Sequence, residues 1–355
     1  MTRSTSRSTS LQQRQFSTAL SKIDLNRRQL LKASIATAGV AMFPGILHAA
    51  PARELRWGSA SLGSTGYIII EALAQAVQRN SEMRCTTLAT SGGAENMVMA
   101  GRGEIDFGQT TSTDWPPATQ GKQPFPDPID ARQVFAYTVW NIPLIVRKDS
   151  DIHSLADLAG KRVMPSTAGG ATAIMHQTIL EAAGVADQVD WTFGSWNDTF
   201  SAFQSGAVDA IPSTLTNGRP SPSLAEIDNT VEFRVLPTDP DVLTRAQQIN
   251  SGLIATTVTA DQWDKIDGEM LIPAISGVLA TPPSVTDDEA YAVCKAIFDN
   301  PEEVRRVGAQ LQDISVDFAV EYLLKEYPVN AGAARYFKEQ GVWRDELVIA
   351  DPVSA

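Results

Sequence analysis

A short junction occurs twice in the sequence, as GRGEIDF at Gly101–Phe107 and as SGAVDA at Ser205–Ala210. In both copies a glycine ends an expected helix, and an acidic residue sits inside the short strand that follows. A helix and further strands precede each copy in the same order. We therefore interpret the two parts of the chain as two related α/β lobes.

The chain around the first copy alternates between strand and helix patterns. The apolar spacing predicts strands at Leu55–Ala60, Arg84–Ala89 and Ile105–Gln109, and helices at Gly66–Arg79 and Ala94–Ala100. This β-α-β-α-β order favours a mostly parallel α/β sheet. A Pro-rich stretch at Trp115–Pro128 is predicted to be a loop.

The pattern starts again after that loop. The expected elements are strands at Val134–Val139, Leu144–Arg147, Lys161–Met164, Val189–Thr192 and Val208–Ile211, and helices at Ala171–Ala183 and Trp196–Gln204. Two further helices are predicted at Asp287–Asp299 and Pro301–Leu311. Two lobes of this kind place a cleft between the carboxyl ends of their strands.

The first fifty residues have the order of an export signal. A Ser-, Thr- and Arg-rich segment is followed by Arg27-Arg28, by an apolar stretch at Leu30–Leu47, and by Ala49, Ala50 and Ala52. The alternative is an unstructured tail followed by an amphipathic helix. We expect residues 1–52 to be removed and the remaining protein to be soluble outside the cytoplasm.

The charge balance excludes nucleic acid as a partner. The chain of 355 residues has 29 basic and 41 acidic residues, and residues 1–52 contain seven of the basic residues and one of the acidic residues. The remaining net charge of −18 repels nucleic acid and anionic lipid. A local site can still oppose this field, so an anionic ligand remains allowed.

The sequence offers no catalytic or metal-binding pattern. Of its three histidines, His48 belongs to the export segment, and neither His153 nor His176 has a recognisable nucleophile or metal-ligating partner in sequence. The expectation is a protein without cofactor or metal that is not an enzyme. Cys85 and Cys294 are expected to be two apolar core thiols, and a disulfide between them is the alternative.

Three turns rich in Gly, Ser and Thr separate a strand from a helix, at Gly63–Gly66, Ser91–Ala94 and Ser166–Thr172. Such turns present unpaired backbone N–H groups at a helix N-terminus, which favours a bound carboxylate. Ordinary helix capping is the alternative for each turn, and core packing is the alternative for the aromatic residues near them. Glu95 is expected to cap its own helix.

The predicted ligand contacts come from these turns, from strand ends and from nearby aromatic residues. They are Ser64, Thr65, Tyr67, Gly92, Gly93, Asn96, Gln109, Thr110, Trp140, Ser166, Gly169, Gly170, Ala171, Thr172, Trp196 and Thr214.

Several motifs together resemble the solute-binding subunits of TRAP transporters of the TAXI type. They are Ser64–Tyr67, Gly92–Asn96, Gly103–Phe107, Leu155–Val163 and Asn330–Tyr336. Ala94 and Gly170 stand where the family has serines. The segment Asn26–Lys32, with Arg27, Arg28 and Lys32, resembles a twin-arginine export signal, which implies export in the folded state.

The resemblance implies a type II periplasmic-binding-protein fold with a ligand cleft between two α/β lobes. Residues 53–141 plus 273–355 would form the first lobe, and residues 142–272 the second. It also implies a periplasmic protein, expected to be a monomer, that delivers a small organic anion, either a dicarboxylate or a glutamate-like compound, to a TRAP-type membrane permease. A ligand-binding module that feeds a sensor, or an exported α/β hydrolase, are the rival interpretations.

Overall fold

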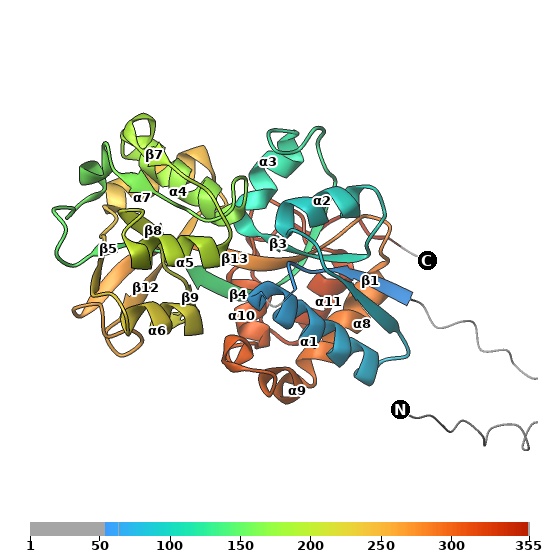
Figure 1. Cartoon of the computed structure of the whole chain (residues 1–355). Coiled ribbons are helices and arrows are strands. Elements are labelled where there is room, and N and C mark those ends of the chain that lie inside the picture. Colours follow the sequence, from blue (N-terminus) through green and yellow to red (C-terminus); the bar gives the residue numbers. More distant parts are fainter. Residues whose placement is uncertain (1–53, 63, 354–355) are drawn as a thin grey trace, which may run out of the picture. The chain divides into compact units, whose positions relative to one another are not determined.

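The computed structural model describes residues 54–62 and 64–353, in which apolar strands assemble into two sheets with helices packed against them (Figure 1). Among these residues the larger sheet has eight strands: β1 Glu54–Gly58, β2 Arg84–Leu88, β3 Phe107–Thr111, β4 Arg132–Asn141, β9 Leu215–Thr216, β10 Arg219–Pro220, β12 Ile254–Thr259 and β13 Glu269–Thr281. The smaller sheet has five: β5 Leu144–Arg147, β6 Arg162–Val163, β7 Asp190–Trp191, β8 Ala210–Pro212 and β11 Phe233–Val235.

The helices that cover these sheets are mostly amphipathic. The α-helices are α1 Thr65–Asn80, α2 Gly93–Gly101, α3 Trp115–Gln120, α4 Ala171–Ala182, α5 Trp196–Ser205, α6 Pro222–Asp228, α7 Pro240–Ile249, α8 Asp287–Phe298, α9 Pro301–Arg305, α10 Val316–Glu321 and α11 Ala331–Glu339. Short 3-10 helices are η1 Ser112–Asp114, η2 Leu155–Leu158, η3 Ala186–Gln188 and η4 Ala309–Leu311.

Both sheets contain the same strand order. In the larger sheet the neighbours run β2-β1-β3-β13-β4, and in the smaller sheet they run β7-β6-β8-β5-β11. The first three strands of each series are parallel, and the fourth is antiparallel to both of its neighbours. The two lobes are therefore topological copies, which confirms the predicted class of two α/β lobes in a type II periplasmic-binding-protein fold.

The repeated junction is built in the same way in both lobes. Arg56 donates from its main-chain N to Asp106 Oδ2 at 2.8 Å, and its guanidinium contacts the same carboxylate and the carbonyl of Gly103. Arg162 contacts Asp209 and the carbonyl of Gly206 in the same pattern. The sequence predicted each acid inside its strand, but each lies directly before it, because β3 begins at Phe107 and β8 at Ala210. Each acid ties a βαβ unit together.

Among the described residues the chain passes between the two sheets four times, from β4 to β5, from β8 to β9, from β10 to β11 and from β11 to β12. The chain leaves the larger sheet after Asn141 and enters the smaller sheet at Leu144, while β13 pairs with β12 over its first half and with β4 and β3 over its second half. The hairpin of β9 and β10 also pairs with β4. Residues 215–220 thus extend the larger sheet. The lobe boundaries at residues 141–142 and 272–273 remain a prediction from the sequence.

The core of the larger-sheet lobe lies between the sheet and its helices. Trp57 and Phe107 stack with ring centroids 4.9 Å apart beneath α1, and both are fully buried. Phe298 packs against Phe135 and Phe337, which joins α8 and α11 to β4. Since burial of a large aromatic side chain contributes about 2–3 kcal/mol, these contacts stabilise the folded lobe.

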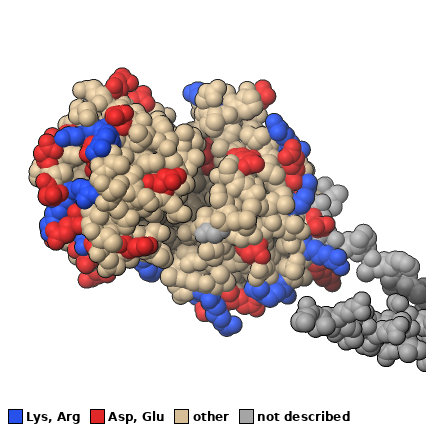
Figure 2. Space-filling view, viewed as in Figure 1, with Lys and Arg blue, Asp and Glu red and all other residues tan. Residues whose placement is uncertain are grey.

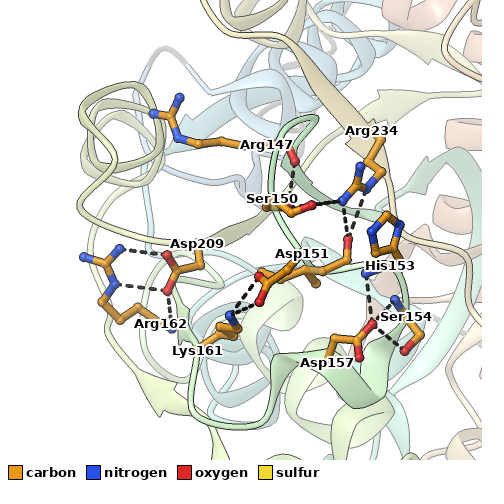
Figure 3. Close-up of polar contacts among 11 residues, drawn as sticks. Arg147, Ser150, Asp151, His153, Ser154, Asp157, Lys161, Arg162, Asp209 and Arg234 are labelled. Atoms are coloured by element: carbon orange, nitrogen blue, oxygen red, sulfur yellow. Dashed lines mark hydrogen bonds and ion pairs between the residues drawn. The ribbon is translucent and has the colours of Figure 1, made fainter.

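Charged residues of the smaller-sheet lobe mainly hold loops (Figure 3). The Arg234 guanidinium donates to the carbonyls of Lys148, Ser150 and Ile152, and Lys161 pairs with Asp151 at 2.9 Å. These cations therefore stabilise loops of the protein itself.

Two sequence expectations need correction. The loop predicted at Trp115–Pro128 contains α3, since prolines are tolerated in the first turn of a helix, where no main-chain donor is needed. The single helix predicted at Pro301–Leu311 is split into α9 and η4.

Other expectations concern export and the cysteines. Cys85 and Cys294 are free thiols, half-buried and buried respectively. The export-signal residues Arg27, Arg28 and Lys32 lie outside the described residues. In the described part of the chain, no helix has both the length and the apolar character to cross a bilayer.

Candidate functional site

The carboxyl ends of β1, β2 and β3 meet at one edge of the larger sheet, because the three strands are parallel neighbours. Asn96 holds this edge together, since its Nδ2 donates to the carbonyls of Ser59 at 2.7 Å and Gln109 at 2.8 Å. The structure thereby brings together the three predicted contact regions of this lobe, namely the turns before α1 and α2 and the end of β3.

The turn before α1 is capped by Ser64, whose Oγ accepts from the main-chain N of Tyr67 at 3.2 Å. Thr65 and Tyr67 are half-buried beside it. The side chain of Gln109 lies against the first turn of α1, where a Cβ at Gly66 would be 2.3 Å from Oε1. Gln109 is 7% exposed and its Oε1 has no hydrogen-bond partner among the described residues.

The turn before α2 begins at Gly92, whose φ of 121° favours glycine. No side chain caps this helix. Glu95 accepts instead from the main chain and hydroxyl of Ser91, which lowers the pKa of Glu95 below its usual range. Glu95 therefore ties the first turn of α2 to the preceding turn through Ser91, and not through the N-cap residue Gly92. A Cβ at Gly93 would lie 2.0 Å from Asp114 Oδ2, so this carboxylate packs directly against the helix N-terminus.

Two of the predicted contacts have their side-chain donors engaged within the protein. Asn96 is fully buried and uses its amide N–H groups on main-chain carbonyls. The hydroxyl of Thr110 donates to the carbonyl of Val278 at 2.8 Å and accepts from Trp115 Nε1. These residues position the strand ends that surround the site.

The contributions of the smaller-sheet lobe lie at the start of α4. Ser166 is buried with a φ of 75°, and its carbonyl accepts from Gly194 N at 3.1 Å, which joins this turn to the loop before α5. Gly169 is exposed, and Gly170, Ala171 and Thr172 are half-buried. Gly170 is the N-cap of α4 and has no side chain. The first N–H groups of this helix therefore have no hydrogen bond from an N-cap side chain.

The remaining predicted contacts lie around these turns. Trp196 is the first residue of α5 and packs against Phe200 with centroids 5.4 Å apart. Thr214 is half-buried between β8 and β9. Trp140 is 9% exposed near the end of β4 and contacts Tyr137 edge to face. Packing therefore accounts for part of each aromatic residue's environment.

The face seen in Figure 2 is hollowed between the two lobes, and most of the residues beside the hollow are uncharged. Two depressions lie elsewhere, one of about 320 Å³ against α1 and β2 and one of about 480 Å³ against α4 and β7. Neither contains a predicted ligand residue. In the described part of the chain, His, Cys, Asp and Glu side chains form no group that could hold a metal ion.

Sequence reasoning missed Asp114, although a signal for it was present. Thr111-Ser112-Thr113-Asp114 follows β3 directly and has the spacing of a capping box. Asp114 Oδ2 accepts from Thr111 N at 2.7 Å and from Thr111 Oγ1 at 2.8 Å. Burial raises the pKa of Asp114 to about 6, against the lowering effect of these hydrogen bonds.

Solved structures with a similar course of the chain include periplasmic binding proteins. The aliphatic sulphonate binding protein SsuA from Escherichia coli is 17% identical, with 81% of this chain and 90% of that chain covered and a TM-score of 0.45. XAC2383 from Xanthomonas citri, bound to ATP, is 12% identical over 82% and 97% with a TM-score of 0.49. A putative L-cystine ABC transporter from Listeria monocytogenes is 16% identical over 73% and 95% with a TM-score of 0.45.

A comparison with sequence models of protein families shows to which family the chain belongs. The NMT1-like family matches residues 57–341, which span both lobes and nearly all of the described elements. The chain belongs to the NMT1-like family.

Proposed function

We propose that this protein is an exported solute-binding protein that captures a small organic anion between its lobes and delivers it to a membrane permease. One observation carries the proposal. Among helices of eight or more residues in the described part of the chain, α2 and α4 alone begin without a side-chain cap. One belongs to each lobe, and both begin at turns predicted to hold the ligand.

Uncapped helix N-termini are suited to an acid group. Their first N–H groups point out of the helix, and the helix dipole adds about half a positive charge. A carboxylate there gains charge-assisted hydrogen bonds without any Lys or Arg. Thr172 at α4 and Gln109 at α1 add side-chain groups, so an acid could be held from both sides when the lobes close.

The membrane partner and the route of export are parts of the same proposal. The motifs Ser64–Tyr67, Gly92–Asn96 and Leu155–Val163 support a TAXI-type TRAP permease as the partner, and Arg27-Arg28 supports twin-arginine export to the periplasm. Family membership and the neighbouring binding proteins support a transport role in general. A gene for a TRAP-type permease beside this one would support the finer assignment, and a gene for an ABC-type permease would contradict it.

Thr172→Val tests the site directly. Valine keeps the shape of threonine but removes its hydroxyl, so a buried ligand acceptor would lose one donor. We expect the affinity for the acid that co-purifies with the protein to fall by about 10- to 150-fold, since a net hydrogen bond to a charged group is worth about 1.5–3 kcal/mol. Isothermal titration of the ligand-free protein measures this.

Thr244→Val is the matched control for that titration. Thr244 is exposed on α7, and its hydroxyl donates to the carbonyl of Pro240 within the same helix. Its substitution should leave the affinity unchanged. Equal affinities for the wild type and both variants, with unchanged thermal unfolding, would remove Thr172 and the α4 turn from the site.

A further inference from the structure

Asp114 is a buried carboxylate at the edge where the predicted ligand contacts meet. It is 4% exposed, follows the carboxyl end of β3, and packs against Gly93 at the N-terminus of α2. Its Oδ2 accepts two hydrogen bonds from Thr111. In the described residues it forms no ion pair with Lys, Arg or His.

A capping role alone does not explain this burial. Asp157 and Asp198 occupy the same position in the capping boxes of η2 and α5, and both are exposed to solvent. Their pKa values lie below the usual range because hydrogen bonds dominate, whereas burial dominates at Asp114 and raises its pKa. A buried carboxylate without a counter-charge costs folding free energy, and such groups concentrate at functional sites.

A second buried polar group without a partner feels the charge of this carboxylate. The hydroxyl of Tyr137 on β4 has no hydrogen-bond partner among the described residues, and burial together with the charge of Asp114 raises the pKa of Tyr137. Trp140 packs edge to face on the Tyr137 ring, with centroids 6.1 Å apart. A carboxylate, a phenol oxygen and an indole ring are the groups that bind a protonated amine.

We infer that Asp114 binds a protonated amino group of the ligand, so that the captured molecule is a zwitterionic acid rather than a simple dicarboxylate. This inference rests on the proposed function and narrows its ligand class. The uncapped N-terminus of α4 holds the acid group, and Asp114, which packs against the N-terminus of α2, holds the amine together with Tyr137. Binding then supplies the missing counter-charge to Asp114.

The experiment identifies the co-purified small molecule and compares two probes. Full-length protein is expressed with its export signal, recovered from the periplasm, and denatured, and the released molecules are treated with dansyl chloride and analysed by mass spectrometry. Ligand-free wild type, Asp114→Asn and the control Asp157→Asn are then titrated with L-glutamate and with glutarate, which differ only in the amino group. Thermal unfolding checks that each variant is folded, and Tyr137→Phe serves as a second variant.

The inference predicts a released acid that reacts with dansyl chloride and is absent from Asp114→Asn preparations but present in Asp157→Asn. Where the probes bind, glutamate should bind at least tenfold tighter than glutarate to the wild type, and Asp114→Asn should equalise the two. A released acid without an amine, retained by Asp114→Asn, overturns the inference and leaves solute binding intact. The absence of any released or bound small molecule overturns the proposed function, and the inference with it.

Discussion

At the scale of single residues, two buried titratable groups contribute to stability with opposite pH dependence. Asp114 has a raised pKa, so its contribution to stability is fully present in acid and is lost as the pH rises through about 6. His176 is fully buried on α4. Burial lowers its pKa to about 3, with a smaller opposing effect from the Ile142 main chain.

His176→Leu should therefore make the protein more resistant to acid. A histidine with a lowered folded pKa contributes stability above its unfolded value of 6.5, and that stability is lost as the pH falls toward 3. The full shift corresponds to about 5 kcal/mol. Urea unfolding at pH 7.5 and pH 4 should show a smaller loss for the variant than for the wild type.

His153→Leu controls for a general effect of histidine removal, because His153 is exposed. It should lose as much stability in acid as the wild type does. Identical losses for His176→Leu and His153→Leu would show that His176 is not neutral and buried in the folded protein.

At the scale of elements, the Arg–Asp junction fixes the two βαβ units. The Asp106 side chain is 8% exposed and the Asp209 side chain is 29% exposed, although both accept from the main chain and guanidinium of an arginine on the first strand of their unit. The same contacts should be worth more where solvent screens them less.

Asp106→Ala should therefore lower the free energy of unfolding more than Asp209→Ala does. We expect a loss of about 2–3 kcal/mol at Asp106 and about 1 kcal/mol at Asp209, from the values of charged hydrogen bonds in buried and exposed settings. Guanidinium denaturation measures both. An equal or reversed ranking would mean that burial does not set the strength of these junctions.

At the scale of the whole molecule, the alternation of strand and helix patterns predicted the repeated βαβ units well. Prediction ended where pairing is non-local. No strand was predicted at β13, which spans both lobes. A strand buried over most of its length lacks the alternation of a half-buried one, and Pro273 and Gly277 interrupt its apolar run. The β9–β10 hairpin was missed because its strands have two residues each.

The residues of the candidate site were likewise predicted where the signal is local and missed where the contact is non-local. The Gly-rich turns were found because glycine and small polar residues between strand and helix are a local signal. The sequence could not show that Asn96 and Thr110 use their donors on main-chain carbonyls of distant strands. Nor could it show that the acid of a local capping box, Asp114, would be buried against Gly93 from another turn.

Hydrogen–deuterium exchange can show whether one small molecule is held by both lobes at once. The protein as purified would be compared with protein stripped of small molecules by unfolding and refolding. We expect slower exchange in the loaded form at Ser64–Tyr67 in the larger-sheet lobe and at Ser166–Thr172 in the smaller-sheet lobe together. Protection in one lobe only, or at the depressions against α1 and β2 or α4 and β7, would contradict binding by both lobes.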